Sequence, residues 1–391
     1  MEKKILFITP NSFTDNNGGL FLFNTLFSYF KECGFYWYTC SNNSKKSLLN
    51  YNFEKTFYVN ERFLNNNILN VLARRYFFLG IPWFFIKYKI FKNYISFKVV
   101  KVINECEIEK LWIYTSQITI PVTKKVVVDT GIKYHLSIQD DIYTHLPNFE
   151  VFWLKDDFKF LIENADSIDF ISNDMECYYR SKFRIKAKST VFLVGRFEEI
   201  ERPIIAKKIK IIGYSGNIWC ADTFIPFLKS IKILNSIRND SIKVKIFTFH
   251  FPYSFFNEYL DIIDFQTIDS YPDLLIELQK CDLLYLPMTF DSNKQVTNIT
   301  SFPSKILTYL NAGVPILNHS PENASSHNFI ISNKVGVSVV DLKVESFVKI
   351  LSNENVLGFE NRIAYSSFSD KALNIFNHDD MVQGFINILY N

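Results

Sequence analysis

Ser304 and Lys305 have the side-chain chemistry of a phosphate-binding pair. They lie in the stretch 301–319, SFPSKILTYLNAGVPILNH, which reads as a loop, a helix, a glycine turn and a buried strand. Pro303 is expected in the first helical turn, where its missing N–H costs nothing. Apolar residues then recur at helical spacing (Ile306, Leu307 and Leu310). Because free N–H groups and the positive end of a helix attract anions, a hydroxyl and an ammonium placed there could hold a diphosphate.

A second set of polar residues follows strands predicted at 210–214 and 243–249. Ser215, Gly216 and Asn217 come directly after the first strand, and His250 comes after the second. Ligands of parallel α/β sheets bind at the carboxyl ends of the strands, so all four residues are candidates for contact with a donor substrate. The alternatives are a purely structural turn at 215–217 and an ordinary surface histidine at 250.

Asp140 and Asp141 are the carboxylates best placed for acid–base work, because they follow a strand predicted at 134–139. Two adjacent carboxylates at a strand end could bind hydroxyls, orient an acceptor or act as a base. They could equally cap a helix. Gln139 precedes them, and its amide can hydrogen-bond a sugar hydroxyl but cannot relay a proton near neutral pH.

The chain opens with a predicted strand at 3–9, a polar loop at 11–19 and an apolar helical pattern from Leu20. Gly18 and Gly19 in this loop allow a ligand to approach the backbone closely, or they form a plain tight turn. Strand, glycine-containing loop and helix are the opening of a Rossmann-like half. The dinucleotide fingerprint GxGxxG is absent, which disfavours a nicotinamide-dependent enzyme.

Further strands alternate with helical segments along the chain. They are predicted at 110–115, 125–129, 168–172, 190–194, 282–287, 314–318 and 335–340. Asp282, at the start of one of them, is expected to connect a helix to a strand, and His135, inside another, is expected to be packed. Strands that alternate with helices indicate an α/β fold with parallel sheets covered on both faces.

A second strand–loop–helix opening at 210–219 divides the chain into two similar halves. The stretch 196–209 is charged, contains Pro203 and has little periodicity, so it is interpreted as a linker. The expected organisation is a Rossmann-like domain at 1–195, the linker, a second Rossmann-like domain at 210–378, and a final helix within 379–391.

The stretch around Lys305 also resembles a known family. Pro303-Ser304-Lys305, Tyr309-Leu310 and Gly313-Val314-Pro315 are similar to the sugar-nucleotide-binding segment of bacterial GT-B glycosyltransferases of the family 4 group. The resemblance implies the GT-B fold, in which two Rossmann-like domains face each other across a cleft. It also implies that the last helix, at 379–390, crosses back to the first domain.

The positions at strand ends, the glycine loop and the resemblance together assign roles to the candidate residues. Donor-binding roles fall to Ser215, Gly216, Asn217, His250, Ser301, Ser304, Lys305, Thr308 and Tyr309. Acceptor-side roles fall to Gly18, Gly19, Gln139 and Asp140, and catalytic roles to Asp140, Asp141 and Lys305. The chain departs from the family pattern at three positions. Gln139 stands where a histidine is usual, and the hydroxyls Ser301 and Thr308 stand where two glutamates are usual.

Composition excludes several other classes of protein. A chain of 391 residues with 48% apolar residues can build two ordinary domains. A net charge of +3 and the lack of a recognised motif give no support to nucleic-acid binding. Six scattered cysteines without a CxxC pair argue against a zinc site or a disulfide scaffold and suit a reducing cytosol. The longest apolar stretch, 76–86, is too short to span a bilayer.

A basic and aromatic stretch at 74–101 stands apart from the rest. Residues 62–104 contain eight lysines or arginines and no acid. This composition suits contact with an anionic membrane surface. The alternative is a core-covering helix pair with solvated lysines, since the lysines do not gather on one face of a helical wheel.

These observations predict a cytoplasmic glycosyltransferase, and the stretch 74–101 allows a peripheral position at the inner face of the membrane. The enzyme would move a sugar from a nucleoside-diphosphate sugar to a saccharide or lipid-linked acceptor in bacterial surface polysaccharide or lipopolysaccharide synthesis. The resemblance implies retention of configuration, whereas an acidic base at Asp140 or Asp141 would permit inversion. No metal and no further cofactor are expected, because Lys305 and the helix dipole can neutralise the diphosphate. The alternatives are a non-catalytic partner subunit, a membrane-docking module and a sugar-nucleotide epimerase.

Overall fold

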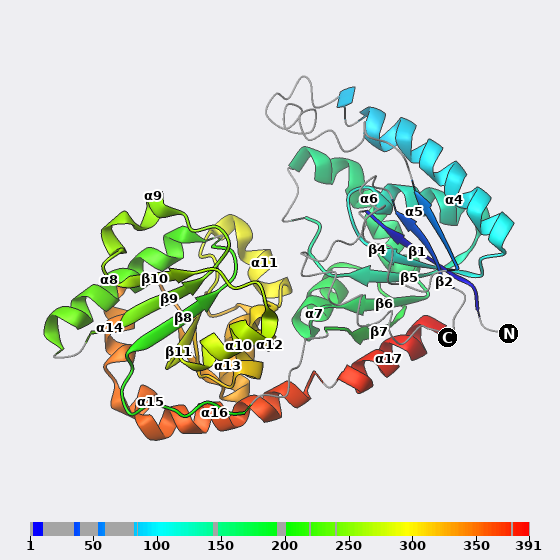
Figure 1. The fold of residues 1–391 in the computed structure, drawn as a ribbon. Coiled ribbons are helices and arrows are strands. Elements are labelled where there is room, and N and C mark those ends of the chain that lie inside the picture. The colour runs from blue at the N-terminus through cyan, green and yellow to red at the C-terminus, as the bar shows by residue number, and fades with distance from the viewer. Residues whose placement is uncertain are drawn as a thin grey trace. The chain divides into compact units, whose positions relative to one another are not determined.

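The computed structural model describes most of the chain, namely residues 3–10, 35–39, 54–58, 82–83, 85–143, 148–193, 201–218, 220–238, 241–376 and 378–390. The chain divides into two compact units (Figure 1). Unit 1 comprises Met1–Val194 together with His378–Asn391, and unit 2 comprises Gly195–Asn377. The boundaries expected from sequence, at 195 and 378, fall beside these divisions.

Unit 1 is built on a parallel sheet of seven strands in the order β3-β2-β1-β4-β5-β6-β7. The strands are β1 (Ile5–Thr9), β2 (Phe35–Thr39), β3 (Lys55–Tyr58), β4 (Lys110–Tyr114), β5 (Lys133–Ile138), β6 (Ser167–Phe170) and β7 (Lys188–Val191). β1 pairs in parallel with both β2 and β4. The central strands are buried along nearly their whole length, as apolar parallel strands covered by helices must be.

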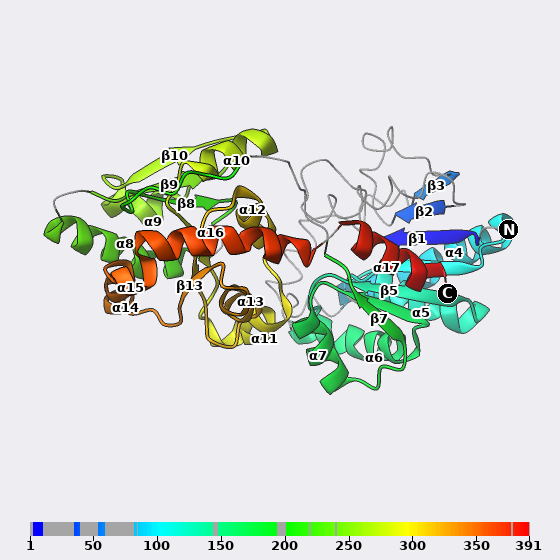
Figure 2. The ribbon, with the colours of Figure 1, turned by 90° about the horizontal axis from the view of Figure 1, so that it is seen from below.

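Helices pack against this sheet, including one from the end of the chain. They are the π-helix η3 (Ile86–Phe91), α4 (Lys92–Cys106), α5 (Thr119–Thr130), α6 (Asn148–Asn164), α7 (Asn173–Lys182) and α17 (His378–Tyr390). Phe385 of α17 packs on Trp112 and Phe192 in one apolar cluster. The Lys110 ammonium donates to the carbonyl of Leu389 at 2.6 Å. The last helix therefore belongs to unit 1, as expected, and lies beside β7 (Figure 2).

The strand predicted at 125–129 is wrong, because these residues lie in helix α5. The run of valines favours a strand by propensity alone. In the structure Val122 and Val126 are buried one helical turn apart, while Val128 is 63% exposed. Packing of this one face therefore overrides the local preference, and Gly131, at φ +67°, ends the helix.

Unit 2 has a parallel sheet of six strands in the order β10-β9-β8-β11-β12-β13. The strands are β8 (Ile211–Ser215), β9 (Lys243–Phe247), β10 (Ile263–Gln266), β11 (Leu283–Pro287), β12 (Ile316–His319) and β13 (Gly336–Val339). The helices are α8 (Ala221–Ile237), α9 (Tyr253–Phe256), α10 (Tyr271–Gln279), α11 (Gln295–Thr300), α12 (Lys305–Ala312), α13 (Ser325–Asn333), α14 (Val344–Leu351), α15 (Glu354–Leu357) and α16 (Phe359–Asn374), with 3₁₀ turns η4 (Asn257–Tyr259) and η5 (Ser292–Lys294).

Asp282 ties the starts of two strands of unit 2 together. Its carboxylate accepts hydrogen bonds from the backbone N–H groups of Lys210 at 2.7 Å and Ile211 at 2.9 Å. Charge-assisted bonds of this kind are the stronger ones in proteins. Asp282 lies between the end of α10 (Tyr271–Gln279) and the start of β11, as expected, and its bonds to β8 are an additional role. With β8 and β11 joined at their amino ends, their carboxyl ends emerge side by side.

Candidate functional site

The chain reverses direction after β8 at Gly216, which has a φ of +98°. A Cβ atom built on Gly216 would lie 2.8 Å from Cε of Lys305. Only glycine therefore allows the loop 215–217 and the side chain of Lys305 to approach this closely. The structure thus brings together two candidates that are far apart in sequence, at the carboxyl end of β8 and the start of α12.

Tyr214 holds the side chain of Lys305 in place. The Lys305 ammonium donates to the Tyr214 hydroxyl at 2.5 Å and lies 4.2 Å from the centre of its ring. The Tyr214 hydroxyl in turn donates to the carbonyl of Asn217 at 2.6 Å. Sequence reasoning missed Tyr214. A tyrosine near the carboxyl end of a buried strand, one residue before a predicted ligand loop, is the signal that could have found it.

The ammonium of Lys305 is a cation without an acidic partner. No carboxylate pairs with it among the residues that the structure describes. Burial lowers the pKa of Lys305 to about 8. A charge that is partly withdrawn from water without a counter-ion is costly, so an anion bound beside Lys305 would lower the energy of the site.

The start of α12 adds backbone donors next to this cation. The N–H groups of Ile306 and Leu307 bond to Pro303 and Ser304 carbonyls. Within the described part of the chain, the N–H groups of Ser304 and Lys305 have no acceptor. Ser304 is exposed, and its hydroxyl makes no capping bond to the helix. Hydroxyl, two N–H groups and the positive end of the helix dipole are thus available to an anion.

Tyr309 has a different role from the one expected. Its ring is fully buried, so it cannot line a nucleoside or sugar as predicted. The hydroxyl accepts from the backbone N–H of Ser215 at 3.1 Å and donates to the carbonyl of Tyr285 at 3.1 Å. Tyr309 therefore fixes the end of β8 and, through it, the position of the loop 215–217.

The other donor candidates of unit 2 lie near the same edge of the sheet. His250 is exposed after β9, which pairs with β8, and the N–H of Gly216 bonds to the carbonyl of Phe247 in β9. Ser301 and Thr308 are half-buried, and their hydroxyls have no partner in the described residues. Both hydroxyls are therefore available to a ligand, but neither brings a charge.

The two carboxylates of unit 1 have separate environments. Asp140 is exposed after β5. Asp141 is fully buried, where it accepts from the Tyr179 hydroxyl at 2.6 Å and from the N–H of Tyr143 at 3.2 Å. The predicted catalytic role of Asp141 is therefore replaced by an anchoring role, since a buried carboxylate held by a tyrosine and a backbone N–H secures the loop. Asp140 is the carboxylate of the pair that faces solvent.

Gln139, beside Asp140, is almost buried, with 7% of its surface exposed. Its amide nitrogen donates to the carboxylate of Asp169 in β6 at 2.9 Å. Asp169 was not singled out from the sequence. Gly18 and Gly19, the remaining acceptor-side candidates, lie outside the described residues.

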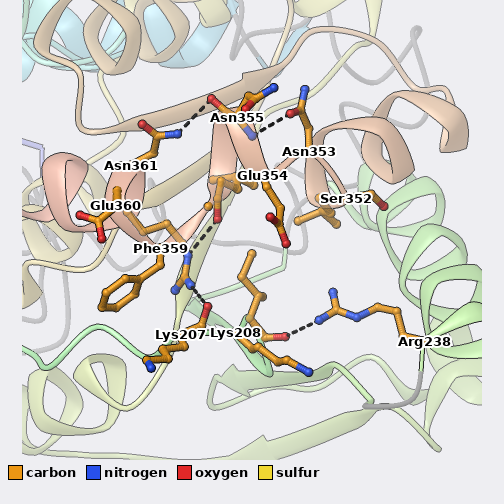
Figure 3. A pocket seen from close by; sticks show the side chains of 15 residues that line it. Lys207, Lys208, Arg238, Ser352, Asn353, Glu354, Asn355, Phe359, Glu360 and Asn361 are labelled. Atoms are coloured by element: carbon orange, nitrogen blue, oxygen red, sulfur yellow. Dashed lines mark hydrogen bonds between the residues drawn. The ribbon is translucent and has the colours of Figure 1, made fainter.

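A cavity of unit 2 lies away from these candidate residues. It has a volume of about 690 Å³ and is lined by residues that precede β8 and by α15 and the start of α16 (Figure 3). Figure 3 shows Lys207 and Arg238 on one side of it and Glu354 and Glu360 on the other. None of the candidate residues lines this cavity, because it lies toward the amino end of β8. No cluster of potential metal ligands occurs in the described ranges.

Comparison with known proteins identifies the fold. No protein-family model matches the chain, and no curated protein matches it by sequence. Among solved structures, sucrose-phosphate synthase from Thermosynechococcus elongatus matches with a TM-score of 0.69 at 10% identity, over 99% of this chain and 98% of that one. Alr3699/HepE from Anabaena, in complex with UDP, matches with a TM-score of 0.66 at 12% identity, over 99% of both chains. The lipopolysaccharide outer core galactosyltransferase WaaB, in its apo form, matches with a TM-score of 0.64 at 11% identity, again over 99% of both.

These structural neighbours are GT-B glycosyltransferases, and the likeness extends over both units of the chain. The fold predicted from the sequence, an α/β protein of the GT-B type with two Rossmann-like domains, is confirmed. At identities near 10%, the likeness establishes the fold, and the activity has to be argued from the residues.

Proposed function

We propose that the protein is a glycosyltransferase of the hexosyltransferase type that uses a nucleoside-diphosphate sugar. The observation that carries the proposal is the pairing of Lys305 with the glycine turn at Gly216. It places a cation, two backbone N–H groups and the Ser304 hydroxyl around one position, and among the described residues no carboxylate pairs with the cation and no acceptor takes the N–H groups. UDP, bound in the HepE structure, is a ligand of the chemistry that such a position would hold.

In this proposal, Lys305 stabilises the diphosphate as it leaves. Negative charge grows on the diphosphate when its bond to the sugar breaks, and a fixed ammonium and helix dipole lower the energy of that state. They supply the charge that a divalent cation would otherwise bring, so we propose that transfer needs no metal. Retention of configuration follows from the family resemblance. The rival outcome, inversion, would need Asp140 as the base, since Asp141 is buried.

We further propose an acceptor of the saccharide or lipid-linked class, in bacterial surface polysaccharide or lipopolysaccharide synthesis. The likeness to WaaB, a lipopolysaccharide galactosyltransferase, supports this setting. In the described residues, no helix is long and apolar enough to cross a bilayer. A protein can also bind the surface of a membrane without spanning it, and the exposed face of η3 and α4 is suited to such binding.

That face combines exposed apolar side chains with lysines. Ile90, Tyr94 and Phe97 are 55%, 47% and 71% exposed and are spaced by three or four residues. Lys89, Lys98 and Lys101 lie among them, and the Lys98 ammonium is 4.4 Å from the centre of the Tyr94 ring. An apolar strip flanked by cations is typical of helices that lie in the interface of an anionic membrane. We therefore propose a peripheral position at the cytoplasmic face of the membrane.

A thermal-shift experiment with UDP, GDP, CMP, ADP and dTDP tests the donor site. We expect one nucleotide to stabilise the protein at low concentration, because a ligand that binds only the folded state shifts its unfolding. Lys305→Ala should abolish the shift, while the matched control Lys349→Ala, an exposed lysine on α14 of the same unit, should preserve it. In transfer assays Lys305→Ala should reduce turnover by roughly a hundredfold or more.

The outcomes separate the rival functions. A protein that no nucleotide stabilises would be a partner subunit or a membrane-docking module rather than a transferase. An epimerase would convert the sugar nucleotide without any acceptor. A shift that persists in Lys305→Ala would place the nucleotide elsewhere and overturn the proposed site.

A further inference from the structure

Polar side chains occur at every second position along β5 and directly after it, at His135, Ser137 and Gln139. All three point to a single carboxylate, that of Asp169, which is fully buried in the neighbouring strand β6. Nε2 of His135 lies 2.8 Å from Oδ1 of Asp169, and the Ser137 hydroxyl donates to the same oxygen. The Gln139 amide nitrogen donates to Oδ2 at 2.9 Å.

The surrounding hydrogen bonds determine which groups donate in this cluster. The Trp112 indole N–H donates to the Ser137 oxygen at 2.8 Å, so the Ser137 proton points to Asp169. Nδ1 of His135 lies 2.8 Å from the hydroxyl of Ser167, and burial lowers the pKa of His135. A neutral His135 that donates from Nε2 and accepts at Nδ1 satisfies both contacts. Asp169 is then a carboxylate that accepts three hydrogen bonds and has no proton to donate.

This arrangement fixes the amide of Gln139. Reversing the amide would place its oxygen against the Asp169 carboxylate, so that two acceptors would face each other and a charge-assisted bond would be lost. The amide nitrogen is therefore committed to Asp169. The amide oxygen has no partner in the described part of unit 1 and lies at the carboxyl end of β5, beside Asp140.

We infer that Asp169 is a positioning residue that turns the amide oxygen of Gln139 outward at the carboxyl end of β5, so that this oxygen accepts a hydrogen bond from a sugar hydroxyl. The inference rests on the proposed transferase function. A histidine nitrogen in this place could donate or accept according to its tautomer, whereas the outward amide oxygen of Gln139 can only accept. Gln139 therefore selects a hydroxyl that is free to donate, and it would reject a sugar in which that hydroxyl is replaced by a methyl ether.

Asp169→Asn tests the inference with almost no change in volume. The amide nitrogen introduced by this substitution can donate to the Gln139 oxygen, which would turn the Gln139 nitrogen outward toward the substrate. We expect kcat/KM for transfer to fall between roughly fivefold and a hundredfold, the scale of a mispaired buried polar group. Stabilisation by the nucleotide, which binds in unit 2, should be unchanged. Gln139→Met, which keeps the length but removes the acceptor, should show a similar loss.

The double variant Asp169→Asn with Gln139→Glu supplies the decisive rescue. The amide introduced at position 169 would donate to one oxygen of the carboxylate introduced at position 139 and leave the other oxygen facing outward as an acceptor. We expect kcat/KM to return to within about threefold of the wild type, which a merely structural role of Asp169 would not produce. Wild-type kinetics in Asp169→Asn, or a double variant as slow as the single variant, would overturn the inference while the transferase function stood.

An NMR measurement that does not depend on enzyme activity completes the test. The side-chain NH₂ protons of Gln139 should exchange slowly with solvent in the wild type, because one of them is bonded to a buried carboxylate. They can be identified by their loss from the NMR spectrum of Gln139→Met. If exchange is slow but the wild type transfers no sugar, the orientation of Gln139 is supported and the transferase function is refuted. Fast exchange would refute the orientation itself.

Discussion

The ammonium of Lys305 lies 4.2 Å from the centre of the Tyr214 ring and 2.5 Å from the Tyr214 hydroxyl. The aromatic face and the hydroxyl oxygen of Tyr214 hold this cation, beside the carbonyl of Asn217 at 3.5 Å. Both attract a cation, but neither neutralises it. The pair therefore positions Lys305 and leaves its charge available to a ligand.

Tyr214→Phe should separate positioning from binding. The ring remains, but the hydroxyl bonds to Lys305 and to the carbonyl of Asn217 are lost. We expect a loss of about 1 kcal/mol in the free energy of unfolding and a fall in nucleotide affinity that is less than tenfold. Urea unfolding and titration calorimetry measure the two quantities. Tyr365→Phe is the matched control, because it removes a hydroxyl bond to Val356 in the same unit and should leave affinity unchanged.

Gly216→Ala should displace the side chain of Lys305. The new Cβ meets Cε of Lys305 at 2.8 Å, and the φ of +98° strains any residue with a Cβ. Gly131→Ala is a control for strain alone, since Gly131 has a φ of +67° and no described atom lies within 4 Å of its Cβ position. We expect both variants to lose about 1–2 kcal/mol of stability. Only Gly216→Ala should also lose nucleotide binding, and equal binding in both would argue against contact between this loop and the phosphates.

The lowered pKa of Lys305 predicts a pH dependence of a definite sign. The group titrates at about 8 in the folded protein and at about 10.5 in the unfolded chain. Between these values the unfolded state binds more protons, so stability should rise with pH. Below pH 8 both states are protonated, so the destabilisation by the buried charge is at its full size and does not change with pH. The difference in unfolding free energy between the wild type and Lys305→Met, measured from about pH 7 to 10, should show this rise. A flat difference would mean that Lys305 titrates normally.

Binding should respond to pH in the opposite direction. A diphosphate pairs with the protonated lysine, so nucleotide affinity should weaken as the pH rises above about 8. Lys305→Arg keeps its charge throughout this range, and its affinity should not weaken there. Parallel loss of affinity in both proteins would assign the pH dependence to another group.

The long buried strands could be predicted from the sequence, because continuous apolar runs such as 283–287 have few other places in an α/β fold. The edge strand β10 (Ile263–Gln266) could not, since only its first residue is buried and the pattern IDFQ carries little signal. The misassigned strand at 125–129 failed for a different reason. Tertiary packing of one helical face outweighed the strand propensity of its valines.

For the candidate site, residue type and position at a strand end could be read from the sequence, but which of the candidate side chains are buried could not. The rule that ligands gather at the carboxyl ends of strands brought Gly216 and Lys305 into one hypothesis, and the structure places them in contact range. Tyr309 and Asp141 have equally suitable chemistry, yet both are buried and serve as anchors. The polar alternation of His135, Ser137 and Gln139, along β5 and directly after it, is a signal of period two that sequence reasoning could have used.

Phe97→Ser tests the proposed membrane contact. Phe97 is 71% exposed on α4 among lysines, so its ring can enter a lipid interface at little cost to the fold. We expect the wild type to sediment with vesicles that contain phosphatidylglycerol and Phe97→Ser to sediment several-fold less. Phe152→Ser is the matched control, since Phe152 is 64% exposed on α6 of the same unit.

Added salt should weaken binding of the wild type, because screening reduces the attraction between lysines and anionic lipids. Equal sedimentation of the two variants would rule out the outer face of α4 as the site of contact.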